Sequence, residues 1–111
     1  MKKVLMMMRV ALLIALVIGL GEMFSFYSAT PVLIDVHIAA GIVVLAAMIT
    51  IARTSRQSVA WIGVVLVAIG GVEAWMSTNM SMATGLVHLA LIVVGVGLTE
   101  MSASRYQKSS S

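Results

Sequence analysis

Four long apolar stretches restrict what this chain can fold into. Apolar residues make up 61% of its 111 residues and charged residues only 10%. Each stretch has about 20 residues, which is enough for a helix to cross the hydrocarbon core of a bilayer. Backbone groups must be satisfied internally in that environment, so a bundle of helices is the expected structure. The predicted helices span residues 4–26, 31–52, 59–77 and 82–101.

The connections between these stretches are short, so consecutive helices are expected to be antiparallel neighbours. We therefore predict an all-α membrane protein, an antiparallel four-helix transmembrane bundle forming a single domain over residues 1–111. Residues 102–111 are expected to form a short polar tail.

The basic residues indicate how the bundle is oriented. All seven fall at one set of helix ends: Lys2, Lys3, Arg9, Arg53, Arg56, Arg105 and Lys108. The positive-inside rule then predicts a plasma or inner membrane protein with both termini in the cytoplasm. Because this topology explains the net charge of +3, the basic character does not indicate nucleic acid as a partner. The chain has no cysteine, which excludes disulfides and iron–sulfur clusters.

An internal repeat relates the two halves of the chain. A shift of 51 residues places Gly19 on Gly70, Glu22 on Glu73 and His37 on His88. These are the only two histidines and two of the four carboxylates. The pattern predicts two repeated helical hairpins, with both histidines in one layer of the outer half of the bundle.

The start of each histidine-bearing helix sets the depth of its imidazole. Thr30 is suited to cap the second helix and Pro31 to its first turn. Ser81 is expected to begin the fourth helix, which places His88 at nearly the depth of His37.

Two matched imidazoles inside a membrane favour binding of one shared group. Ionisable side chains at that depth are costly and are usually functional. Four-helix bundles place cofactors between facing helices, and histidine is a common axial ligand of heme. We therefore expect His37 and His88 to be the axial iron ligands of one heme b. Glu22 and Glu73 would then be acceptors that hold an imidazole N–H.

Small residues lie one turn away from the two histidines: Ala40, Gly41, Thr84 and Gly85. They leave room for a flat ring or for close helix packing.

Other functions fit parts of the sequence. Glu22, His37, Glu73 and His88 could form a divalent metal site or transport path. Thioethers at the outer end suit copper: Met76, Met80 and Met82. Four helices in a chain of this length also suit a small multidrug-type transporter, although the first helix has no deep carboxylate. A structural or assembly subunit and a homo-oligomer are further alternatives.

The fourth predicted helix carries one carboxylate near its inner end, Glu100. It is expected to form an interfacial ion pair with Arg53 or Arg105.

The segments around the two histidines resemble one four-helix half of the heme A synthase family. They are Ile34-Asp35-Val36-His37-Ile38-Ala39-Ala40-Gly41 and Ala83-Thr84-Gly85-Leu86-Val87-His88. That family is similar in having a heme-ligating histidine on the second and fourth helix of each half. The resemblance implies heme ligation by His37 and His88. The family's catalytic glutamate precedes the first of these histidines by three residues, where this chain has Ile34, so no catalytic role is implied. Other minimal b-type membrane cytochromes have the same ligand arrangement.

These observations favour a heme-binding protein over a catalyst. Single-electron transfer near the outer membrane face is the expected function, with a quinol or a redox protein as partner. Heme sensing or heme carriage would use the same two ligands.

Overall fold

The computed structural model describes residues 1–24, 26, 30–76 and 82–110. It contains four α-helices: α1 (Lys2–Met23), α2 (Pro31–Ser55), α3 (Ser58–Met76) and α4 (Met82–Ser110). Each helix is long and apolar enough to cross a membrane. The prediction of an all-α chain with four helices long and apolar enough to cross a membrane is thus confirmed.

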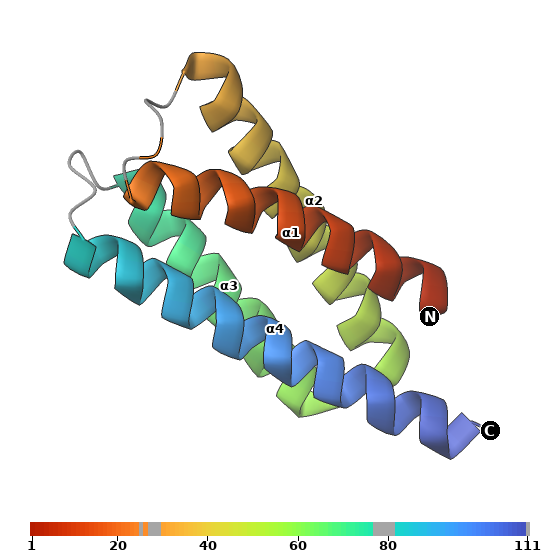
Figure 1. Ribbon diagram of the computed structural model, residues 1–111. Helices are drawn as coiled ribbons and strands as arrows, with labels where there is room; N and C mark the ends of the chain where they lie inside the picture. The colour runs from red at the N-terminus through yellow and green to blue at the C-terminus, as the bar shows by residue number, and fades with distance from the viewer. Residues whose placement is uncertain (25, 27–29, 77–81, 111) are drawn as a thin grey trace.

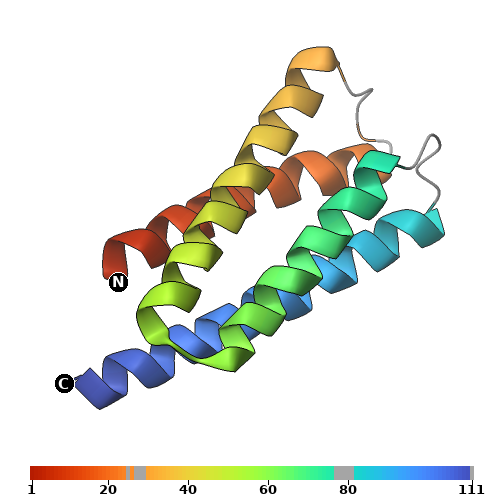
Figure 2. The same cartoon turned by 180° about the vertical axis from the view of Figure 1, so that it is seen from behind.

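The two ends of the molecule differ in charge. Both chain termini and the α2–α3 connection lie at one end, which we call the basic end because Lys2, Arg53, Arg56 and Arg105 lie there (Figure 1). The last turns of α1 and α3 and the first turns of α2 and α4 lie at the opposite end, which we call the loop end. The start of α2 lies apart from the other three helix ends there in both views (Figures 1 and 2).

Capping groups define both ends of α2. The Thr30 hydroxyl accepts a hydrogen bond from the Leu33 N–H at 3.2 Å, and Pro31 occupies the first helical position. This start agrees with the sequence prediction. At the other end, Arg56 adopts the left-handed region with φ 57°, and its N–H donates to the Ala52 carbonyl at 3.1 Å. The helix therefore ends at Ser55, three residues later than expected.

The fourth helix is longer than the sequence suggested. It continues to Ser110, so most of the expected polar tail is helical. Its 29 residues give a length of about 44 Å at 1.5 Å per residue. The helix is thus longer than the hydrocarbon core of a bilayer, which is about 30 Å thick. Ser81, the expected start of this helix, lies outside the described residues.

The core lies mainly towards the basic end. Met8, Met48 and Ile51 are fully buried there, as are Thr99 and Ser102. Towards the loop end, the buried residues of the described chain are all small: Gly21, Ala40, Gly70 and Gly85. The bundle is therefore filled with large side chains in one half and much less so in the half that holds the histidines.

Glycines allow α3 and α4 to approach closely. A Cβ atom added to Gly63 would lie 2.6 Å from the Gly95 carbonyl oxygen. A Cβ atom added to Gly95 would lie 2.6 Å from Val67 Cγ2 and 2.8 Å from the Gly63 oxygen. Such backbone contact between small residues is typical of membrane helices. The close packing of α3 and α4 therefore depends on Gly63 and Gly95.

Candidate functional site

The two histidines of the chain lie close together. His37 belongs to α2 and His88 to α4, and both side chains are half-buried. Their ring centroids are 6.4 Å apart and their planes are inclined by 54°. The structure thus brings together the two imidazoles that the repeat singled out.

Each imidazole is anchored to the backbone of the preceding helix. His37 Nδ1 lies 2.9 Å from the carbonyl oxygen of Ala15 on α1, and His88 Nδ1 lies 2.8 Å from that of Gly70 on α3. Because a carbonyl oxygen can only accept, each Nδ1 must carry the hydrogen and donate it. In the neutral ring, Nε2 then has a free lone pair, which is the form that binds a metal.

Glycines make room for these anchors. A Cβ atom on Gly19 would lie 3.2 Å from His37 Cε1 and 3.8 Å from its Nδ1. A Cβ atom on Gly70 would lie 3.7 Å from His88 Nδ1 and 3.2 Å from Leu91 Cβ. Gly19 and Gly70 are equivalent under the 51-residue shift, so each histidine lies against the same glycine of its half.

The two anchors are nevertheless not identical. His37 follows its acceptor by 22 residues, whereas His88 follows its acceptor by 18. On α3 the acceptor is Gly70 itself. On α1 the acceptor is Ala15, one helical turn before the equivalent glycine, Gly19. Gly19 follows Ala15 by four residues, so the missing side chain leaves the Ala15 carbonyl accessible.

Backbone oxygens take the role that the sequence suggested for carboxylates. Glu22 is exposed and Glu73 half-buried, and neither is the acceptor of an Nδ1 hydrogen. Within the described residues, no three His, Cys, Asp or Glu side chains are close enough to hold a metal ion. The four-residue site expected of Glu22, His37, Glu73 and His88 is therefore not assembled in this structure, and Met80 of the suggested copper segment lies outside the described residues.

The small residues around the histidines have different surroundings. Gly41 is exposed, and a Cβ atom there would meet nothing within 4 Å. Ala40 is buried, and Thr84 is half-buried. A Cβ atom on Gly85 would lie 3.0 Å from Met23 Sδ, so this thioether covers Gly85 one turn before His88. Gly41 therefore borders open space on the exposed side of α2, one turn after His37.

An ion pair joins the first and last helices nearer the basic end. Arg9 Nε donates to Glu100 Oε1, and Arg9 Nη2 donates to Glu100 Oε2, both at 2.8 Å. The ion pair expected of Glu100 is present, but the predicted partner, Arg53 or Arg105, is wrong. Arg9 is the partner because α1 runs beside α4 at this level, which helix ends in the sequence do not specify.

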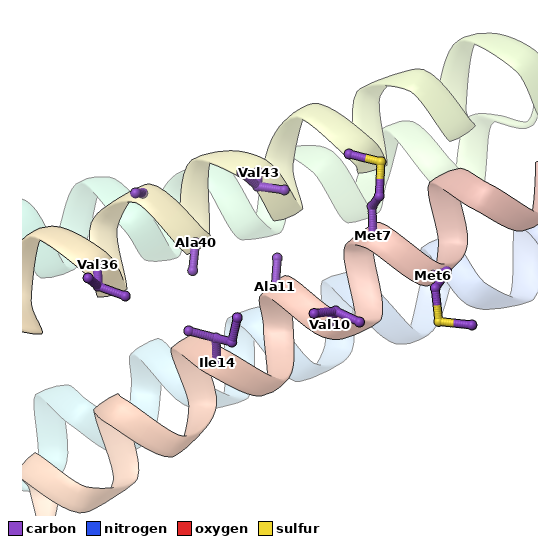
Figure 3. Close-up of a pocket in the computed structure, with 9 residues that line it drawn as sticks. Met6, Met7, Val10, Ala11, Ile14, Val36, Ala40 and Val43 are labelled. Carbon is purple, nitrogen blue, oxygen red and sulfur yellow. The ribbon is translucent and has the colours of Figure 1, made fainter.

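An apolar groove runs between α1 and α2, with a volume of about 510 Å³ (Figure 3). The sequence analysis missed it, because a groove depends on how two helices diverge. Small side chains such as Ala11 and Ala40 leave the space open. The groove is lined by Met6, Met7, Val10, Ala11, Ile14, Val36, Ala39, Ala40 and Val43.

Comparison of the chain with protein-family models, with curated proteins and with solved structures found no match.

Proposed function

We propose that this chain is a heme-binding integral membrane protein in which His37 and His88 are the two axial ligands of one heme b. The observation that supports this most strongly is the imidazole pair, with each Nδ1 anchored to a carbonyl and the rings 6.4 Å apart.

The spacing of the rings suits one metal ion between them. Metal–nitrogen bonds to imidazole are about 2 Å long, so two imidazoles on opposite sides of one ion have ring centres about 6 Å apart. The observed separation of 6.4 Å is close to this value. The separation of the rings therefore supports their assignment as two ligands of one iron.

The number of ligands also favours heme over a simple metal ion. Only two metal-binding side chains meet in the described part of the chain. A zinc site usually has at least three protein ligands. A porphyrin brings four nitrogens of its own and needs only the two axial positions from the protein.

The packing of the loop end is compatible with a flat ring system. The buried residues described there are glycine or alanine, and Gly41 borders open space one turn from His37. A ring system beside His37 would meet no described side chain at Gly41, whereas near His88 it would contact Met23 at Gly85.

The residues of the chain would fix the imidazoles and occupy both axial positions. The carbonyls of Ala15 and Gly70 hold each ring in the tautomer with a free Nε2 and limit its rotation. Heme bound in this way supplies one-electron redox chemistry. Because His37 and His88 would leave no open position on the iron, we infer electron transfer rather than catalysis, with a quinol or a redox protein as the partner.

We also infer that the bundle consists of two repeated antiparallel hairpins, with both termini in the cytoplasm. The matching contacts of Gly19 with His37 and of Gly70 with His88 support the repeat. The basic residues gathered at the end with both termini support the orientation (Figure 1).

Substitution of each ligand tests the proposal. Wild-type protein, His37→Ala, His88→Ala and the double variant would be purified and their heme and metal contents measured per chain. Gly97→Ala is the matched control, because Gly97 lies outside the proposed heme site and a Cβ atom there meets nothing within 4 Å. We expect one heme per chain in the wild type and control, reduced retention in each single variant and none in the double variant. Full heme retention by the double variant, or a colourless wild type with stoichiometric zinc or copper, would contradict the proposal.

A further inference from the structure

We propose that the basic end carries a binding site for the phosphate headgroup of an anionic phospholipid, formed by Arg53, Arg56 and Arg105. This site is independent of the histidine pair.

A contact at the basic end joins the segments of α2 and α4 that carry these arginines. Gln57, in the α2–α3 connection, lies against α4, with its Nε2 donating to the Ser102 carbonyl at 3.4 Å. Arg53 and Arg56 lie within four residues of Gln57, and Arg105 lies three residues after Ser102. All three arginines are exposed. The three arginines, which belong to α2, its C-cap and α4, therefore lie within about one helical turn, along the chain, of the Gln57–Ser102 contact.

The positive charge of this cluster is not neutralised by the described protein residues. The nearest carboxylate in the sequence of α4, Glu100, has both oxygens engaged by Arg9 at 2.8 Å. No carboxylate in the described ranges lies at ion-pair distance from Arg53, Arg56 or Arg105. The remaining acidic residues, Glu22, Asp35 and Glu73, belong to the loop end of their helices. The cluster is thus free to bind an external anion.

The position of the cluster favours a lipid headgroup as that anion. Arginine presents a planar fork that matches phosphate oxygens in a bidentate geometry. The three arginines lie at the ends of helices that are long and apolar enough to cross a membrane. Trp61 and Tyr106 lie close by in the sequence, and such aromatic side chains mark the headgroup level. A phosphate held here would therefore be at the depth of phospholipid headgroups.

Tryptophan fluorescence can report on this site. Trp61 follows Arg56 by five residues, and the second tryptophan, Trp75, belongs to the loop end. In the Trp75→Phe background, only Trp61 emits. The full chain in detergent would be titrated with phosphatidylglycerol carrying brominated acyl chains, which quench nearby indole, and in parallel with brominated phosphatidylcholine.

Three variants separate a defined site from general charge attraction. Arg53→Gln with Arg56→Gln removes two charges from the cluster, whereas Lys2→Gln with Lys3→Gln removes two charges from the same end outside it. Gln57→Leu disrupts the contact with Ser102 without changing charge. One basic residue near an anionic surface changes affinity about fivefold. The affinity for phosphatidylglycerol is read from the lipid concentration that gives half-maximal quenching. We expect the double arginine substitution to lower this affinity at least about twentyfold and Gln57→Leu about fivefold. The double lysine substitution should lower it less than about fivefold.

Other results would overturn the proposal. Equal losses for the arginine and lysine pairs would indicate charge attraction alone, as would unchanged binding by Gln57→Leu. Equal quenching by the two lipids would remove the role of the anionic headgroup. Reversal of quenching by millimolar inorganic phosphate would identify free phosphate as the ligand instead. Circular dichroism of each variant would establish that the helices are retained.

Discussion

At the residue scale, the site depends on hydrogen bonds between imidazoles and backbone carbonyls. The free lone pair of each Nε2 follows from Nδ1 donating to Ala15 or Gly70. A glycine lies against each ring, so the imidazole reaches the neighbouring helix without a steric conflict. On α1 the acceptor, Ala15, and the glycine that makes room, Gly19, are different residues, whereas on α3 Gly70 has both roles.

Gly19→Ala should therefore weaken heme binding without removing a ligand. The new Cβ atom would lie 3.2 Å from His37 Cε1, so the ring must move by a few tenths of an ångström from its acceptor. Loss of such a supporting interaction typically costs 10- to 100-fold in metal affinity, so we expect a loss of about tenfold. Heme titration of the purified protein measures this. Gly97→Ala, outside the proposed heme site, is the control, and equal affinities for the two variants would contradict the role of Gly19.

At the scale of elements, the contact between α3 and α4 is fixed by backbone rather than by side chains. Gly63 and Gly95 face each other so closely that a Cβ atom on either meets a carbonyl oxygen at less than 3 Å. A helix backbone cannot rotate out of such a contact as a side chain can. The two helices would have to separate, which would also change the position of His88 relative to Gly70.

Gly63→Ala should destabilise the bundle by about 1–3 kcal/mol, the usual cost of overpacking. Gly97→Ala is the matched control on α4, because a Cβ atom there meets nothing within 4 Å. We expect the control to change the free energy of unfolding by less than about 0.5 kcal/mol. Unfolding in mixed micelles with increasing denaturing detergent, followed by circular dichroism, measures both. Similar stability for the two variants would mean that α3 and α4 do not pack this closely.

At the scale of the whole molecule, the Arg9–Glu100 pair links the first helix to the last. The side chains are 56% and 32% exposed, so solvent weakens their attraction. Pairs of this kind typically contribute about 0.2–1 kcal/mol. The geometry is bidentate, which places this pair towards the upper part of that range.

A charge exchange tests this link. Arg9→Glu and Glu100→Arg should each lower the free energy of unfolding, because each places two like charges together. The double variant should recover more than about 1 kcal/mol relative to the sum of the single changes, because it removes both repulsions and restores the attraction. Thermal unfolding in detergent, analysed as a double-mutant cycle, measures this coupling. Additive effects of the two substitutions would show that the pair does not hold α1 and α4 together.

The sequence was most informative where the relevant physics is local. The Thr30–Pro31 start of α2 follows from capping preferences, and four helices follow from apolar length. The pairing of His37 with His88 was expected from the repeat, and the structure places the rings 6.4 Å apart. The partner of Glu100 and the acceptors of the imidazoles could not be predicted. Both depend on which helix lies beside which, and a carbonyl oxygen has no signature in the sequence.

The most direct test of the proposed function is the visible absorption spectrum of the purified wild-type protein, oxidised and then reduced with dithionite. Ligation of one heme by His37 and His88 predicts a red protein with a low-spin spectrum and a sharp α band after reduction. A colourless protein, or a high-spin spectrum that indicates an open axial position, would contradict it.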